Sequence, residues 1–571
     1  MQRVFLEPSN PTHRQYEALR AFFVEGLPSA QAAERFGYRP AGFRVLCHKL
    51  RENSKRRFFL PPAKGPHAAP KKDSLREQVV ALRKQNLSIY DISRELQTLG
   101  KRLSPAAVSI ILTQEGFARL PRRADDERPG RQGPEPAEVA DARALNLSPR
   151  SFHTQFGGLF LFLPALVQLG VPSLVEAAGF PGSQMVPAAS AMLSLLAMKL
   201  FGRRRHSHVM SCVMDEGLAL IAGLNVVPKR SFLTEYSCRL DPGCYRPLMH
   251  AWFDGVRKLG LAWGNSFNLD FHTIPFHGED ALVQKHYVTK RSRRQKGILA
   301  FIAEDYEQRV FCYGNTDLRA EQHADEILRF VEFWKERTGG LPKELVFDSQ
   351  LTTYAKLNAL SKMGVDFITL RRRSGKMLKD IHQAPLSAWK RIELEGVARA
   401  YRTPRILESR IQLADYEGQL RQIAATDLGH EEPTVLLTNQ LDRSAATLIS
   451  RYAQRMIIEN SIAEAIEFFH MDALSSAVAM KVNCDLQLTL MAGSLYKLLA
   501  GRVGHGYEHA KASRLFRDFV DATATVQITK DQIAVRFQKR AHNPLLLSAG
   551  FQETDLPVLW LGNKRLRLIF G

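Results

Sequence analysis

The feature of this sequence that most restricts its fold is a pair of short apolar runs in its centre, each carrying one aspartate. In "FNLDFHTIPFHG" (267–278), Leu269 and Phe271 fall on one face of a predicted strand and Asp270 on the other. In "KELVFDSQ" (343–350), Asp348 directly follows the last apolar residue. Burying an aspartate in a sheet is costly unless it is paired or binds a cation, so both positions indicate a polar site.

The elements around these runs follow a definite order along the chain. After the first strand come two strands predicted as an antiparallel hairpin, "ILAFIAED" (298–305) and "QRVFCYGN" (308–315), with a turn around Asp305 to Glu307. An amphipathic crossover helix (319–340) leads to the strand that ends in Asp348, and a further helix and strand follow. This is the ribonuclease-H-like order, so we predict an α/β catalytic domain whose mixed sheet places Asp270 and Asp348 on neighbouring strands.

Asp348 has two interpretations. As a helix cap, its carboxylate would accept a backbone N–H of the helix that follows. As part of a metal site, it would act together with Asp270 on two divalent ions, which need several oxygen ligands. The second interpretation requires a third carboxylate elsewhere in the chain.

A third carboxylate occurs in the strongly helical run "SRYAQRMIIENSIAEAIEFFH" (450–470). Tyr452, Arg455 and Glu459 stand at i, i+3 and i+7 and therefore share one helix face. Arg offers a rigid fork that suits phosphate, Tyr a hydroxyl donor, and Glu a hard oxygen ligand. A solvated helix face with an Arg/Glu pair four residues apart is the plainer alternative.

The N-terminal part contains two units of one design. In residues 14–51, a helix ends at Gly26, Ser29 is predicted to cap a short helix, Gly37 turns the chain, and a third helix starts near Pro40. Residues 75–117 repeat the pattern, with caps at Ser88 and Ser104 and a break at Gly100. The spacing is that of helix-turn-helix units, and two in tandem favour bipartite reading of a DNA site, although small three-helix packing units would look the same.

The overall charge agrees with a nucleic-acid partner. The 571 residues contain 79 Lys plus Arg against 58 Asp plus Glu, a formal net charge of +21. Two apolar stretches, 157–171 and 188–202, are too short to span a bilayer and predict buried helices, so no membrane partner is expected. The N-terminal residues lack the apolar core of an export signal, which predicts a cytoplasmic, nucleoid-associated protein.

The cysteines and histidines give little indication of a metal centre. The six cysteines are scattered singly, and no disulfide framework is expected. His206, His208, Cys212, Cys238 and Cys244 do not have the spacing of a zinc site. No phosphate-binding loop for a nucleotide occurs, so ATP is not expected.

The strand-end aspartates and the Tyr-x2-Arg-x3-Glu pattern together resemble the DDE transposases of bacterial insertion sequences. The resemblance covers roughly residues 265–500 and is to the branch with a Tyr-x2-Arg-x3-Glu-x6-Lys signature, whose Lys position is Ile466 here. It implies that Asp270, Asp348 and Glu459 hold two Mg²⁺ or Mn²⁺ ions for cleavage and strand transfer of DNA. It also implies that Tyr452 and Arg455 contact phosphate near the scissile bond.

The same resemblance bears on the partners and on one tryptophan. Double-stranded DNA, both element ends and target, is the implied partner, with a homodimer as the active form. Members of this branch often pass through a DNA hairpin with a flipped base, and Trp389, beside Lys390 and Arg391, is a candidate to stack on that base. A core position for Trp389 is the competing interpretation.

The predicted organisation has eight parts. They are a helix-turn-helix DNA-binding unit (1–53), a basic linker (54–73), a second helix-turn-helix unit (74–122), a linker (123–147), a wholly helical domain (148–262), the ribonuclease-H-like catalytic domain (263–372 and 440–500), a β-rich insertion (373–439) and a C-terminal segment (501–571). Two other functions stay open: a sequence-specific DNA-binding regulator or inactive transposase relic, and a structure-specific nuclease on the same fold.

Overall fold

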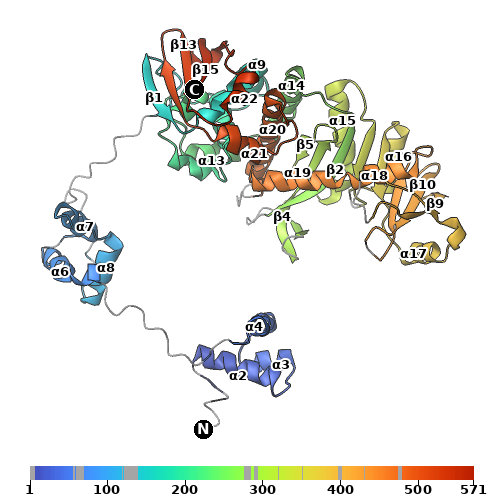
Figure 1. The fold of residues 1–571 in the computed structure, drawn as a ribbon, viewed down its shortest axis with the longest axis horizontal. Coiled ribbons are helices and arrows are strands. Elements are labelled where there is room, and N and C mark those ends of the chain that lie inside the picture. Colours follow the sequence, from blue (N-terminus) through green and yellow to red (C-terminus); the bar gives the residue numbers. More distant parts are fainter. Residues whose placement is uncertain are drawn as a thin grey trace. The chain divides into compact units, whose positions relative to one another are not determined.

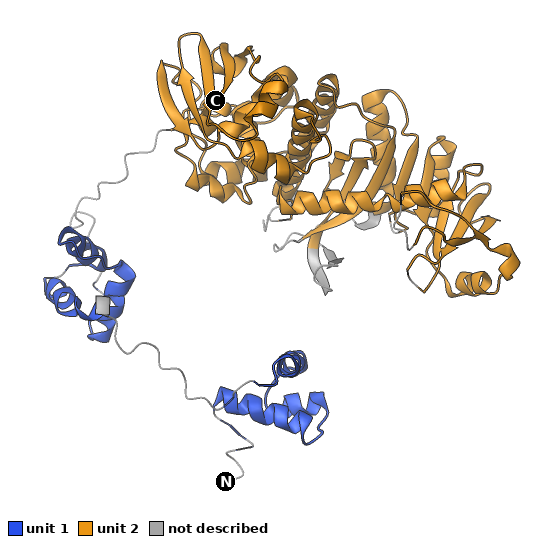
Figure 2. Ribbon diagram, in the orientation of Figure 1, with its two compact units in different colours: residues 1–133 blue, residues 134–571 orange. Residues whose placement is uncertain are grey.

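The computed structural model divides the chain into two compact units, residues 1–133 and 134–571 (Figure 2). The structure describes residues 10–55, 70–85, 87–118, 139–275, 284–288, 293–318, 320–349, 351–396, 401–429, 431–472 and 479–571, together with residues 5, 7, 8, 58 and 120.

The first unit contains two three-helix groups, each with its own core. The first group consists of α2 (Pro11–Phe23), α3 (Ser29–Arg35) and α4 (Pro40–Glu52), and the second of α6 (Arg76–Lys84), α7 (Ile89–Thr98) and α8 (Pro105–Gln114). A single helical turn, α5 (Pro70–Asp73), precedes the second group. Phe43 and Ala32 are fully buried in one core, and Ile92 and Val108 in the other.

The caps of these helices agree with the sequence except at one place. Ser88 forms a capping box with Asp91, and the Ser104 side chain accepts the N–H of Ala107. The prediction that Ser29 caps α3 is wrong: Pro28 is the N-cap, Ser29 is already helical, and no side chain caps this helix. The ring of Pro28 fixes the extended entry to the helix without a hydroxyl cap.

The second unit begins with a helical layer. Its elements are β1 (Arg150–Thr154), η1 (Gly157–Leu161), α9 (Leu163–Leu169), α10 (Val171–Ala177), α11 (Ala188–Leu200), η2 (His206–Ser211), α12 (Glu216–Ile221), α13 (Arg230–Arg239), η3 (Pro242–Cys244) and α14 (Tyr245–Lys258). The prediction that 148–262 is wholly helical is wrong at its start. Strand β1 pairs antiparallel with a strand near the C-terminus, which no pattern in either segment alone could indicate.

The C-terminal part completes the same body. It contains α20 (Ala479–Val503), α21 (Ala512–Leu515), η8 (Phe516–Val520), β12 (Ala524–Ile528), β13 (Gln532–Phe537), α22 (Asn543–Ser548), β14 (Leu556–Val558), η9 (Leu559–Leu561) and β15 (Lys564–Phe570). The strands form a five-stranded sheet in the order β1-β12-β13-β15-β14.

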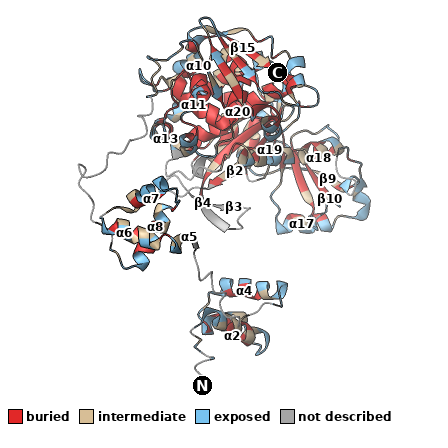
Figure 3. Cartoon of the chain, turned by 60° about the vertical axis from the view of Figure 1, so that its left-hand side comes forward, coloured by how far each residue is buried: buried red, intermediate tan, exposed pale blue. Residues whose placement is uncertain are grey.

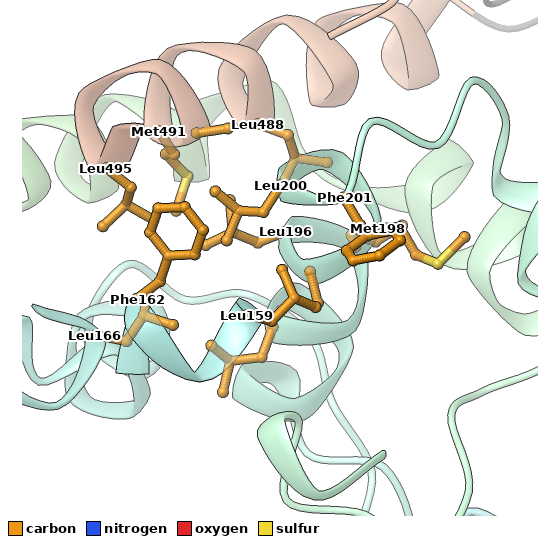
Figure 4. Close-up of a cluster of buried hydrophobic side chains, with 14 of the residues drawn as sticks. Leu159, Phe162, Leu166, Leu196, Met198, Leu200, Phe201, Leu488, Met491 and Leu495 are labelled. Atoms are coloured by element: carbon orange, nitrogen blue, oxygen red, sulfur yellow. The ribbon is translucent and has the colours of Figure 1, made fainter. Parts of the chain in front are cut away.

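One hydrophobic core joins the helical layer to the C-terminal part. Figure 4 shows Leu196 and Leu200 of α11 meeting Leu488 and Leu495 of α20, with Phe162 beside them. Figure 3 shows buried residues gathered along α11 and α20. The apolar stretches 157–171 and 188–202 therefore lie in a protein core, as predicted. Within the described residues, no helix combines the length and the apolar character that crossing a membrane requires.

The central part of the second unit is a ten-stranded sheet (Figure 1). Its elements are β2 (Ser266–Pro275), β3 (Gln284–Val288), β4 (Arg293–Asp305), β5 (Val310–Asn315), η5 (Ala320–Asp325), α15 (Glu326–Thr338), β6 (Glu344–Phe347), α16 (Tyr354–Lys362), β7 (Asp366–Leu370), α17 (Gly375–His382), η6 (Leu386–Ala388), β8 (Lys390–Arg391), β9 (Arg405–Ile411), β10 (Leu420–Thr426), β11 (Thr434–Thr438), α18 (Ala445–Ala453) and α19 (Met456–Glu467).

Five strands of this sheet carry the predicted order. Strands β5, β4, β2, β6 and β7 lie side by side in that sequence, with β4 antiparallel to both β2 and β5. Strand β6 runs parallel to β2 and to β7. The hairpin prediction is confirmed, because Asp305 of β4 pairs with Val310 of β5.

The two faces of the sheet are covered by different helices. Side chains such as Leu269 and Phe347 pack under α15 and α16, whereas Val346 packs under α18. Because side chains alternate along a strand, residues two positions after Val346 or Asn268 return to the α18 face. Asp348 and Asp270 are these residues.

The segment 373–439 is continuous with the sheet. Strand β11 pairs antiparallel with β7, and β10, β9 and β8 extend the sheet outward from it. Its strands therefore extend the central sheet through β11 instead of forming a separate layer.

Candidate active site

The two aspartates lie side by side on neighbouring parallel strands. The register pairs Ser266 with Glu344 and Leu269 with Phe347, so one residue further it places Asp270 beside Asp348. Adjacent strands are about 4.8 Å apart, and laterally paired residues of parallel strands point to the same face. Both carboxylates therefore face α18 and α19 from one point of the sheet.

Asp348 does not cap a helix. Its Oδ1 accepts the N–H of Ser349 at 2.5 Å, within the turn that follows β6. The next helix, α16, starts at Tyr354 with Thr353 as its N-cap. The capping interpretation of Asp348 is wrong, because Asp348 lies five positions before the N-cap Thr353.

The helical run 450–470 is not one uninterrupted helix. Helix α18 ends at Ala453 and α19 begins at Met456. Between them, the N–H of Arg455 bonds to the carbonyl of Tyr452 at 2.9 Å, an i to i+3 bond that tightens the turn. The strict i, i+3, i+7 placement of one regular helix is therefore altered at Arg455.

Arg455 lies between two of the three carboxylates. One terminal nitrogen donates to Asp270 Oδ2 at 3.2 Å, and the other donates to Glu459 Oε1 at 3.1 Å. The Arg455 side chain is 10% exposed, and that of Glu459 is 49% exposed. The guanidinium carbon of Arg455 lies 5.7 Å from the ring centre of Tyr452. The segment that runs from α18 into α19 thus brings Tyr452, Arg455 and Glu459 against the two strand-end aspartates.

The Nε of Arg455 is buried and has no hydrogen-bond partner among the described residues. A buried donor left unsatisfied costs free energy. Arg455 therefore retains an N–H for an acceptor that the chain itself does not supply.

The pKa shifts show that these groups form one electrostatic cluster. Burial raises the pKa of Asp270 to about 6; Arg455 opposes this shift, while Glu459 and Asp348 add to it. Burial raises the pKa of Tyr452 to about 12 against the effect of Arg455. Burial works to lower the pKa of Arg455, but Tyr452 and the three carboxylates hold it above its ordinary value.

The donor chemistry of the cluster suits a hard divalent cation. Mg²⁺ and Mn²⁺ prefer carboxylate oxygens, and the aspartates present theirs from adjacent positions. As the side chains lie, no group of three His, Cys, Asp or Glu residues within the described ranges is arranged to hold an ion. Arg455 provides the positive charge between Asp270 and Glu459 instead.

A second buried polar cluster lies next to the first and was missed by the sequence analysis. Arg451, only 5% exposed, donates from Nε to Glu344 Oε1 at 2.9 Å. Its terminal nitrogens donate to Asn268 Oδ1 and Ser266 Oγ, both at 2.8 Å, and its guanidinium carbon lies 3.9 Å from the ring centre of Tyr306. This arginine fastens α18 to β2 and β6, the strands that carry the aspartates.

Glu344 and Glu304 complete this cluster. Burial alone would raise the pKa of Glu344, but Arg451 and the donors around it hold it below the ordinary value. Asn268, which accepts from Arg451, also donates from Nδ2 to Glu304 at 3.2 Å. Glu304 accepts a second hydrogen bond from the Ser461 hydroxyl of α19. A glutamate at the start of the buried run "ELVF" was the available sequence signal, although nothing in the sequence indicated Arg451 as its partner.

Trp389 and Ile466 lie in apolar surroundings. Trp389 is half-buried and packs against the cluster of Met377, Ile381, Ala424 and Val435. Its stacking role stays a prediction. Ile466, at the Lys position of the signature, packs against the large core of the unit.

Comparison with solved structures gives a distant likeness. No protein-family model and no curated protein sequence matches the chain. Among solved structures, the chain is similar to the piggyBac transposase in a synaptic complex with hairpin DNA, determined by cryo-EM, with 13% sequence identity. The alignment covers 64% of this chain and 85% of that one, with a TM-score of 0.33. A likeness this distant does not assign a function.

Proposed function

We propose that this protein is a transposase of the DDE type, which binds the ends of a mobile element and carries out metal-dependent cleavage and strand transfer of DNA. The observation that supports this best is the register that sets Asp270 beside Asp348, facing Glu459 of α19 and Arg455 at its N-cap. The strand order β5-β4-β2-β6-β7, with β4 antiparallel, supports a ribonuclease-H-like catalytic domain.

Each polar side chain has a role in this proposal. Asp270, Asp348 and Glu459 hold two Mg²⁺ or Mn²⁺ ions, and Glu459 is exposed enough to turn away from Arg455. When bound, such ions activate a nucleophile and stabilise the leaving oxygen in an in-line displacement at phosphorus. Arg455 and Tyr452 bind the phosphate near the scissile bond, with the unpaired Nε of Arg455 available to a phosphate oxygen.

Recognition of the element ends is assigned to the first unit. Its two three-helix groups have separate cores and are each of the size of a helix-turn-helix unit. The charge of +21 favours association with DNA. Joining two ends requires two catalytic sites, so we further propose a homodimer as the active form.

One observation favours a different function. Because the three carboxylates are not arranged to hold an ion among the described residues, the same fold could act as a DNA-binding regulator whose acidic residues are structural. Metal-dependent chemistry distinguishes the two functions.

The test is to incubate the purified full chain with labelled DNA from the ends flanking its own gene, and with shuffled DNA, in Mg²⁺, in Mn²⁺ and in EDTA. The transposase proposal predicts cleavage at the ends in either metal and none in EDTA. End binding without cleavage in any metal supports the regulator. Equal cleavage of shuffled DNA indicates a nuclease instead.

A further inference from the structure

Helix α19 carries Glu459 of the candidate active site. A cavity of 440 Å³ lies against another side of this helix. It is bounded by α19, β5, α20 and the segment 509–515, and Asn460 and Ser461, which directly follow Glu459, line it. Pockets of this size accept small organic ligands.

The rim of this cavity is cationic. Arg309, Lys497, His509 and Lys511 line it, and Arg309, Lys497 and Lys511 form no ion pair with any carboxylate of the described residues. Burial lowers the pKa of the Lys497 ammonium, and the nearby charge of Arg309 lowers it further. Asp305 and Glu508 act against this lowering, but the pKa of Lys497 stays below its ordinary value. Cations gathered at one opening favour an anionic ligand.

The one carboxylate lining the cavity does not offset these cations fully. Glu464 accepts the N–H of Ala512 at 2.5 Å, and burial raises its pKa. Its position fixes the segment that carries Lys511 against α19. The rim therefore keeps a net positive charge around a defined opening.

The floor of the cavity is apolar and partly aromatic. Phe311, Phe469, Tyr496, Leu490 and Ile457 line it. Free phosphate would gain nothing from such a floor, whereas a nucleobase is a flat group that packs well on apolar and aromatic surfaces. A cationic rim above an apolar floor matches the two ends of a nucleotide.

We propose that this cavity binds one nucleotide unit, with its phosphate at Arg309, Lys497 and Lys511 and its base over the apolar floor. The source is a single strand of nucleic acid or a free nucleoside monophosphate, which share this chemistry. The cavity adjoins the helix that carries Glu459, so a strand bound here would lie next to the candidate active site. Binding of a nucleic-acid strand in this cavity rests on the proposed transposase function, whereas binding of a free nucleotide does not.

A variant that fills the cavity tests the proposal without changing charge. Gly493 of α20 lines the cavity, and a Cβ at this position would have no atom within 4 Å. In Gly493→Leu the new side chain occupies the cavity, and the loss of a helix glycine should keep the melting temperature at or above that of the unaltered chain. Gly375→Leu, at another glycine with open space around its Cβ, is the matched control.

The readout is the rate at which lysines of the full chain are acetylated, mapped by mass spectrometry in EDTA. Thymidine monophosphate, thymidine, inorganic phosphate and an oligothymidylate of about ten nucleotides are the probes. Lys335, an exposed lysine of α15 outside the cavity, is the internal control. Since no metal is present, failure of the cleavage proposal does not affect this measurement.

The proposal predicts that thymidine monophosphate or the oligonucleotide slows acetylation of Lys511 and Lys497 in proportion to the fraction bound. Lys335 should be unaffected, and the protection should vanish in Gly493→Leu but persist in Gly375→Leu. If the oligonucleotide protects at a lower concentration than thymidine monophosphate, the ligand is a nucleic-acid strand. If thymidine monophosphate protects at the lower concentration, the ligand is a free nucleotide. Equal protection by inorganic phosphate, protection that survives in Gly493→Leu, or no protection of Lys511 overturns the proposal.

Discussion

Arg455 donates to Asp270 over 3.2 Å, so this member of the candidate triad is paired with a cation from the chain itself. The same guanidinium reaches Glu459, and together these contacts hold the carboxylates in a metal-free arrangement. An incoming divalent ion has to compete with Arg455, and the released guanidinium is then available to a phosphate.

Replacing Arg455 by Met should therefore strengthen the response to metal. In the metal-free variant the three carboxylates repel one another without compensation, so the melting temperature should fall. Added Mn²⁺ should raise it by more than in the unaltered chain, because no guanidinium has to be displaced. Cleavage should still decrease, since a phosphate donor is lost.

The matched control is Arg329→Met, which breaks a 3.2 Å pair with Glu326 on α15. Its response to Mn²⁺ should equal that of the unaltered chain. An Arg455→Met variant with the same response as this control would contradict the competition between Arg455 and the metal.

Arg451 should matter for stability far more than an exposed arginine. Arg451→Met leaves Glu344 buried without its main partner, which typically costs about 3–5 kcal/mol of unfolding free energy. Adding Glu344→Gln should recover part of that loss. Arg405→Met, at an exposed pair with Asp427, should cost far less than Arg451→Met, because solvent screens an exposed ion pair. Urea unfolding of the variants measures these differences, and equal losses at both arginines would contradict the role of Arg451.

The raised pKa of Asp270 predicts how stability depends on pH. Its carboxyl titrates near 3.8 in the unfolded chain and at about 6 in the folded one. Because the pKa is higher in the folded chain, ionisation of Asp270 lowers the free energy of unfolding. This loss is absent below about pH 4 and fully present above about pH 6, where it reaches at most about 3 kcal/mol. In EDTA, the melting temperature of Asp270→Asn relative to the unaltered chain should therefore increase from pH 4 to pH 7. A difference that stays constant, or decreases, contradicts this titration.

Trp389 offers a test of how the second strand is cut. If its ring stacks on a flipped base, Trp389→Ala should nick element ends but form few hairpins, with nicked DNA accumulating on a denaturing gel. Its packing against the cluster that contains Met377 and Ile381 predicts some loss of stability as well. The stacking role is excluded if the folded variant forms hairpins at the normal rate.

The sequence predicted those parts of the fold that depend on local patterns. The alternation around Leu269, the apolar runs 298–305 and 308–315, and the spacing of apolar residues in 319–340 were enough to predict β2, the β4–β5 hairpin and α15, respectively. The pairing of β1 with β12 was not predictable, because it joins segments some 370 residues apart. The extension of the sheet through β11 depends in the same way on long-range pairing.

The same distinction between local patterns and long-range contacts applies to the candidate site. The residue types and spacing of Tyr452, Arg455 and Glu459 were visible in the sequence, whereas the break between α18 and α19 was not, because strong helix formers surround it. The roles of Arg451 and Glu304 became apparent only in three dimensions, since their partners lie 107 and 157 positions away in the chain.

The most direct test of the proposed function compares Asp270→Ala, Asp348→Ala and Glu459→Ala with the unaltered full chain on labelled element ends in Mg²⁺. The three carboxylates are proposed to hold ions and not to read bases, so each variant should bind the ends nearly as well as the unaltered chain. Each should also lose cleavage and strand transfer. Asp380→Ala, at an exposed carboxylate on α17, should keep both activities. Substantial Mg²⁺-dependent cleavage by any one of the three folded variants would contradict the metal-binding triad.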